Sequence, residues 1–178
     1  MKLQLLAIPF LAALLLALAA APACGGDDAS PPEQYFRQLQ ETRAELSQRF
    51  TALQDEFDAA LASESTDAEI TEAARDYYGG NLSILEDTIS RLEEIEPPAE
   101  AAEAHQEFVE AVKGFVAVSE DLSARAERAE SVSELEDLLA GADRDEFDAV
   151  AGRFEEACLA LQDIADANGI AADLNCEG

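Results

Sequence analysis

Apolar side chains recur at intervals of three and four residues through most of this 178-residue chain, and this spacing constrains its fold more than any other feature. It is the period of an α-helix that buries one face. The repeat is most regular at nine positions in the second half of the chain: Ala101, His105, Phe108, Val112, Phe115, Ser119, Leu122, Ala126 and Ala129. Alternating runs of β-branched and aromatic residues, which are typical of sheets, are missing. The sequence therefore predicts an all-α protein.

Capping signals divide the pattern into helices. Proline is tolerated in the first turn of a helix, so we expect a first helix to begin at Pro31-Pro32 with Ser30 as its N-cap. Its apolar stripe is Phe36, Leu39, Leu46, Phe50, Leu53, Phe57 and Ala60, and Arg43 breaks the rule at one position. Thr66 and Glu69 have the spacing of a capping box, which predicts the start of a second helix that ends at Pro97-Pro98.

Two further helices follow, with a short helical piece between them. The third helix covers residues 101–129, and the short piece runs from Ser131 to Leu139. Gly141 breaks the pattern there. The last helix is predicted to start among the acidic residues 143–146 and to end at Asn168-Gly169, which resembles a helix C-cap.

The connections between the first three helices are short, which makes these helices antiparallel neighbours. We therefore expect an antiparallel up-down four-helix bundle over residues 33–168. Extended hairpins that pair between molecules as a coiled coil are the alternative, because the same repeat serves both. Gly79-Gly80 lies in the middle of the second helix and weakens it there. This pair indicates a kink, a close approach of two helices, or a ligand against the backbone.

The first residues have the layout of an export signal. Lys2 is followed by an apolar run from Leu3 to about Ala20 and then by small residues up to Cys24. Small residues directly before a cysteine resemble a bacterial lipobox. In such a signal the leader, here residues 1–23, is removed, and the thiol of Cys24 receives a diacylglyceryl group with fatty acyl chains such as palmitate.

Two other ways of processing stay open. Ala21 stands where a lipobox usually has leucine, and Ala21-x-Ala23 also fits ordinary signal peptidase, which would release a secreted protein. The apolar run is also close to the ~20 residues that span a bilayer, so a membrane helix that is not cleaved is the second alternative. Residues 24–32 are rich in glycine, aspartate and proline and are expected to form a flexible stem. We expect lipidation at Cys24.

The three cysteines support this expectation. An odd number in an exported chain leaves one thiol to be explained. If Cys24 carries the lipid, Cys158 and Cys176 remain as a pair that an oxidising compartment would join. The helix end at Asn168-Gly169 lets the tail, residues 169–178, turn back along the last helix. We therefore predict a disulfide between Cys158 and Cys176; a metal site is the rival interpretation.

The chain carries a formal net charge of −28. A field of this sign repels nucleic acid and anionic head groups, so nucleic acid is not an expected partner. The simplest interpretation is a solvated acidic face on each helix. Attraction of cations or basic partners, and a surface suited to high salt, are the alternatives.

No motif predicts an enzyme. A di-iron bundle needs Glu-x-x-His, but Ala102 stands three residues before His105, the single histidine. Haem-attachment, nucleophile-elbow and phosphate-loop motifs are also missing. We expect no cofactor and no metal. Weak candidates for a ligand site are the polar or amphipathic residues at or near the apolar stripes: Arg43, Tyr77, Tyr78, Asn81 and His105.

Three short stretches carry a resemblance to a known group. Glu96-Pro97-Pro98-Ala99-Glu100 through His105, the end from Cys158 to Asp173-Leu174-Asn175-Cys176, and the Cys-Gly-Gly-Asp-Asp start are similar to those of small acidic lipoproteins from high-GC bacteria. The resemblance implies a helical, membrane-anchored protein and implies no activity.

The function expected from the sequence is a non-catalytic binding or interaction module on the extracytoplasmic face of the cell membrane. Its expected partners are the lipid bilayer, through acylated Cys24, and an envelope protein. One alternative is a structural acidic spacer or a coiled-coil assembly unit. The other is a secreted soluble protein that binds a small ligand or a cation.

Overall fold

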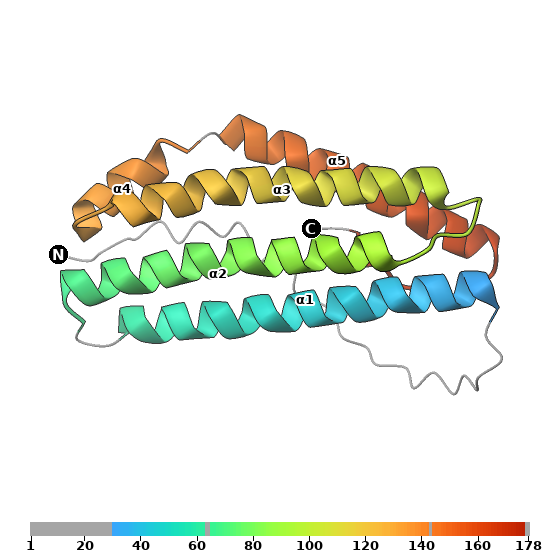
Figure 1. The fold of residues 1–178 in the computed structure, drawn as a ribbon, viewed down its shortest axis with the longest axis horizontal. Helices are drawn as coiled ribbons and strands as arrows, with labels where there is room; N and C mark the ends of the chain where they lie inside the picture. The colour runs from blue at the N-terminus through green and yellow to red at the C-terminus, as the bar shows by residue number, and fades with distance from the viewer. Residues whose placement is uncertain (1–29, 63–64, 143, 177–178) are drawn as a thin grey trace.

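The computed structural model describes residues 30–62, 65–142 and 144–176. Five helices and no strand are found in these residues: α1 (Pro31–Ala62), α2 (Asp67–Glu94), α3 (Ala102–Arg128), α4 (Val132–Ala140) and α5 (Arg144–Ala167) (Figure 1). The prediction of an all-α protein is confirmed. The leader 1–23 and Cys24 lie outside the described residues. The stem assigned to residues 24–32 does so up to residue 29, and its last two residues already belong to α1.

The predicted capping box at Thr66 is present at the start of α2. The Thr66 hydroxyl accepts a hydrogen bond from the Glu69 amide, and the Glu69 carboxylate accepts one from the Thr66 amide at 2.7 Å. Ser131 caps α4 in the same way by accepting from the Glu134 amide at 3.2 Å. Each cap satisfies amides that have no partner inside the helix, typically worth about 1 kcal/mol.

The helices pack in chain order. α1 packs on α2, α2 on α3, and α3 on α5, and the directions of α1, α2 and α3 alternate (Figure 1). The short α4 packs on α3 and α2. α1 and α5 make no extensive contact with each other, so helices do not close the fourth side of this arrangement. α4 ends at Ala140 and α5 begins at Arg144, and α5 has 24 residues against the 32 of α1.

The core is formed by the apolar stripes of the long helices. Its largest members come from α1, α2, α3 and α5: Tyr35, Phe36, Leu39, Phe50, Ile84, Leu85, Leu92, Val109, Val112 and Leu161. A second, smaller cluster joins α2 and α3 to α4 through Ala74, Ala126, Ala129 and Leu135. Burying one large aliphatic or aromatic side chain contributes about 1.5–3 kcal/mol. These clusters therefore hold the helices together.

α5 ends in a Schellman motif. Gly169 has φ +66°, and the amide of Ile170 donates to the Ala165 carbonyl at 2.9 Å while the Gly169 amide donates to Asp166 at 3.0 Å. Glycine adopts this left-handed backbone without a Cβ clash. The turn reverses the chain, as the Asn168-Gly169 pair predicts.

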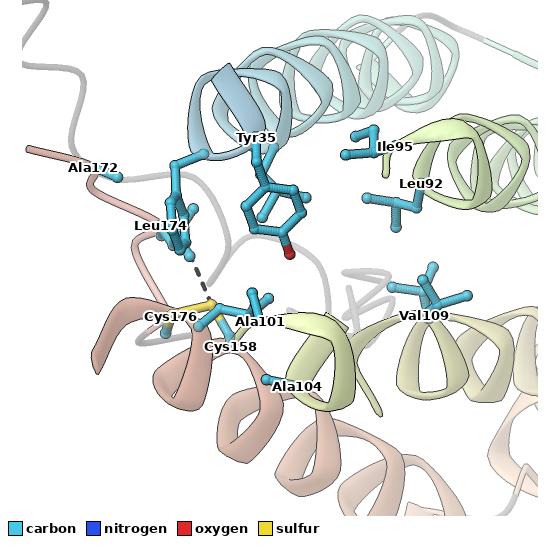
Figure 2. Close-up of a cluster of buried hydrophobic side chains, with 14 of the residues drawn as sticks. Tyr35, Leu92, Ile95, Ala101, Ala104, Val109, Cys158, Ala172, Leu174 and Cys176 are labelled. Carbon is cyan, nitrogen blue, oxygen red and sulfur yellow. Dashed lines mark hydrogen bonds between the residues drawn. A yellow bond between two sulfur atoms is a disulfide. The ribbon is translucent and has the colours of Figure 1, made fainter. Parts of the chain in front are cut away.

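The segment after this turn, residues 170–176, lies back on α5 and is called the strap below. Its residues Ala172, Leu174 and Cys176 are buried in the main core (Figure 2). The predicted disulfide is present, with the sulfurs of Cys158 and Cys176 2.02 Å apart. Gln162 adds two bonds, donating to the Ala172 carbonyl at 2.8 Å and accepting from the Leu174 amide at 2.9 Å. The strap is therefore fixed to α5 at every second residue: Ala172 and Leu174 by hydrogen bonds and Cys176 by the disulfide.

α2 is helical through Gly79 and Gly80. A Cβ built on Gly80 would lie 2.9 Å from Cδ1 of Leu53 in α1, whereas one built on Gly79 would meet nothing within 4 Å. Of the three explanations offered by the sequence, close approach of two helices therefore applies at Gly80. Nothing around Gly79 requires glycine.

Candidate functional site

The five residues proposed from the sequence do not form one site. His105 faces residue 35 of α1, and Tyr77 faces residue 54 of the same helix. Arg43 lies between these levels, about 12 Å from the first and about 16 Å from the second at 1.5 Å per helical residue. The candidates therefore lie at three separate levels along α1, and each level is described in turn as a place.

The first place joins α1 and α2 around Tyr77. Its hydroxyl donates to Gln54 Oε1 at 2.9 Å, and its ring stacks on Phe57 with centroids 4.8 Å apart. Tyr78 packs edge-on against Tyr77 at 5.3 Å. Burial, with a smaller effect of Tyr77, raises the pKa of Tyr78 to about 12. A phenol with a raised pKa stays protonated near neutral pH, and its ring is packed against Tyr77.

Asn81 belongs to the same place and is almost fully buried, at 3% exposure. Its amide interacts with the Tyr77 hydroxyl, an effect that partly offsets the rise in the pKa of Tyr77 caused by burial. Its Oδ1 is buried without a hydrogen-bond partner among the described residues. An unpaired buried acceptor costs about 1–3 kcal/mol.

The second place joins α1 and α3 at the buried His105. The Tyr35 hydroxyl lies 3.0 Å from its Nδ1, and the two rings meet edge to face with centroids 5.6 Å apart. Burial lowers the pKa of His105, and an interaction with the Leu92 backbone partly offsets this. The hydroxyl and Nδ1 are hydrogen-bonded to each other, so the pair is a satisfied core contact.

The third place is a small cavity next to Arg43. It has a volume of about 40 Å³ and lies between α1, α2, α3, α5 and the strap. Twelve residues line it: Leu39, Thr42, Arg43, Leu46, Thr88, Leu92, Phe108, Val112, Phe154, Cys158, Leu161 and Leu174. Most of them are apolar, and the hydroxyl of Thr88 is already bound to the Ile84 carbonyl at 2.7 Å. Arg43 is the one charged residue of the lining.

The half-buried guanidinium of Arg43 makes no hydrogen bond or ion pair with any residue that the structure describes. Burial lowers its pKa, and the negative charge of Asp173 in the strap counteracts this. Asp173 is not within ion-pair distance, and its Oδ1 accepts from the Asn175 amide at 2.9 Å. Of the five candidates, Arg43 alone is therefore free to bind a ligand at a cavity.

The described residues were also compared with the requirements of a metal site and of a membrane-spanning helix. Among them, no three His, Cys, Asp or Glu side chains are grouped to hold a metal ion. None of the described helices has the length and hydropathy to cross a membrane.

The sequence pattern did not predict Tyr35 and Leu174 as site residues. Tyr35 directly precedes the stripe residue Phe36, and the position of Leu174 depends on the reversal of the chain.

The chain matches no family model, no curated protein and no solved structure with which it was compared. The resemblance to small acidic lipoproteins therefore stays a prediction.

Proposed function

We propose that this chain is a lipoprotein of the cell envelope, anchored through acylated Cys24 on the extracytoplasmic face of the membrane, whose helical part binds another molecule without catalysing a reaction. The observation that carries the proposal is the disulfide between Cys158 and Cys176. It consumes two of the three cysteines, and Cys24 is left as the thiol directly after the small residues of the leader. Disulfides persist in oxidising compartments, which agrees with export.

The spacing between anchor and fold supports the same proposal. α1 begins at Pro31, seven residues after Cys24. At about 3.3–3.6 Å per extended residue, this stem reaches at most about 25 Å. The helical part would stand just above the bilayer, where its negative charge would keep it off anionic head groups.

The fold is proposed to be a variant of the up-down four-helix bundle. α1, α2, α3 and α5 supply four long amphipathic helices in chain order, and the strap stands in for the missing contact between α1 and α5. A binding role is favoured over a catalytic one because Tyr35, His105 and Thr88, which are three of the buried polar groups, are bonded to one another or to the backbone.

The test is the intact mass of the protein extracted from membranes of its host. We expect a chain that starts at Cys24 with a diacylglyceryl group, in which Cys158 and Cys176 are alkylated only after reduction. Cys24→Ser is the matched control and should release the protein from the membrane fraction without changing its far-UV circular dichroism. An unlipidated chain with a third reactive thiol would rule the anchor out.

A further inference from the structure

The cavity lies among α1, α2, α3 and α5, and the strap contributes to its wall. α1 and α5 make no extensive contact, and between them the strap residue Leu174 packs beside Tyr35 and the disulfide (Figure 2). Leu174 is 5% exposed and forms part of the cavity wall. Displacing the strap would therefore open the cavity without separating any packed pair of long helices.

Arg43 supplies the polar end of this space. It is the single charged residue of a mainly apolar lining, and no described residue hydrogen-bonds to it. A guanidinium presents a planar fork of donors that matches the two oxygens of a carboxylate. The carboxylate of Asp173 in the strap makes no ion pair with this guanidinium and accepts from the Asn175 amide instead.

We propose that the cavity is a binding site for an aliphatic monocarboxylate, with its carboxylate on Arg43 and its chain in the cavity in place of Leu174. This inference rests on the proposed binding role and is independent of the anchor. The overall negative charge does not oppose it strongly, because exposed charges are screened beyond about 8 Å at physiological salt.

The available volume sets the length of the chain. A cavity of about 40 Å³ holds about three water-sized groups. Removing the side chain of Leu174 adds the space of four more carbons. The ligand chain is thus about seven carbons long, which makes octanoate the natural probe.

Binding of sodium octanoate is measured by isothermal titration calorimetry on the mature chain with Cys24→Ser, which removes the attached acyl chains as competitors. Arg43→Gln should weaken binding about ten-fold or more, because a charge-assisted, bidentate contact is lost. Arg37→Gln is the matched control, since it removes the same charge from an exposed position of the same helix. Leu174→Ala enlarges the cavity and should strengthen binding several-fold.

Three results would overturn the proposal. They are equal binding by the Arg43→Gln and Arg37→Gln variants, equal binding of neutral 1-octanol, and no binding of octanoate by either the parent chain or the Leu174→Ala variant. A protein that is lipidated but binds no octanoate would leave the anchor standing and remove only the site. Octanoate binding by a chain that is never lipidated would do the reverse.

Discussion

The hydroxyl of Tyr35 lies 3.0 Å from Nδ1 of His105 and joins α1 to α3 across 70 residues of sequence. Both residues are buried, at 2% and 7% exposure, at the end of the molecule where the strap also packs. Burial at this contact lowers the pKa of His105 and so favours its neutral imidazole. Packing and protonation are therefore coupled at this point.

The first prediction concerns pH. The pKa of His105 is lowered from the ordinary value of 6.5 by burial, so the unfolded chain takes up this proton before the folded chain does. The contribution of His105 to stability is fully present above pH 6.5 and is lost as the pH falls through the lower pKa of the folded state. Urea unfolding at pH 7.5 and 5.5 should show this loss.

His105→Gln is the control for that experiment, because glutamine can accept from Tyr35 but does not titrate. The difference in unfolding free energy between the parent chain and this variant should shrink as the pH falls. A difference that stays constant between the two pH values would contradict the argument.

The second prediction concerns the glycine pair in α2. Gly79→Ala should stabilise the protein by about 0.5–1 kcal/mol, because alanine is the better helix former and the new methyl group meets nothing within 4 Å. Gly80→Ala should not, since its Cβ would lie 2.9 Å from Leu53 and the gain in helix propensity is offset by repacking. Thermal unfolding of both variants tests the difference. Equal stabilisation by both would show that the Leu53 side chain yields to the new methyl group at little cost.

The third prediction concerns the strap. Replacing Cys158 and Cys176 together by alanine should lower the unfolding free energy by about 3 kcal/mol, the value expected for a closed loop of this size. In this double variant, hydrogen exchange should be faster at the Leu174 amide, which donates to Gln162, than at the amides of α2. Uniform loss of protection along the chain would mean that the strap does not open separately.

The fourth prediction concerns the end of α3. The guanidinium of Arg75 in α2 donates from Nε to the Ala126 carbonyl at 3.3 Å and from Nη2 to the Ala129 carbonyl. Arg75→Met keeps the aliphatic stem but leaves these carbonyls without their donor, and should cost about 1.5–3 kcal/mol in urea unfolding. Arg128→Met removes a charge from an exposed residue of the same helix end and should cost less than about 1 kcal/mol. Similar losses for the two variants would assign the effect to charge alone.

The helices could be predicted because their signals are local. The capping box at Thr66, the break at Gly141 and the C-cap at Gly169 each involve residues within a few positions of one another, and all three are present. The disulfide could also be predicted, because a reversal of the chain at Gly169 brings Cys176 back alongside Cys158 in the last helix. Tyr35 was missed because the 3–4 spacing selects its neighbour Phe36, although both are buried.

The sequence by itself determined the helices, their ends and the cysteine pair, since helix period, capping and chain reversal act over short separations along the chain. Only the tertiary structure decided which polar residues meet. It placed Tyr77 against α1, paired His105 with Tyr35, and left Arg43 at a cavity under Leu174. The physical reason is that a helical repeat specifies which face of each helix is buried. It does not specify the axial level at which two faces pack, or which side of the arrangement stays open, because those depend on how all the side chains fill the shared core.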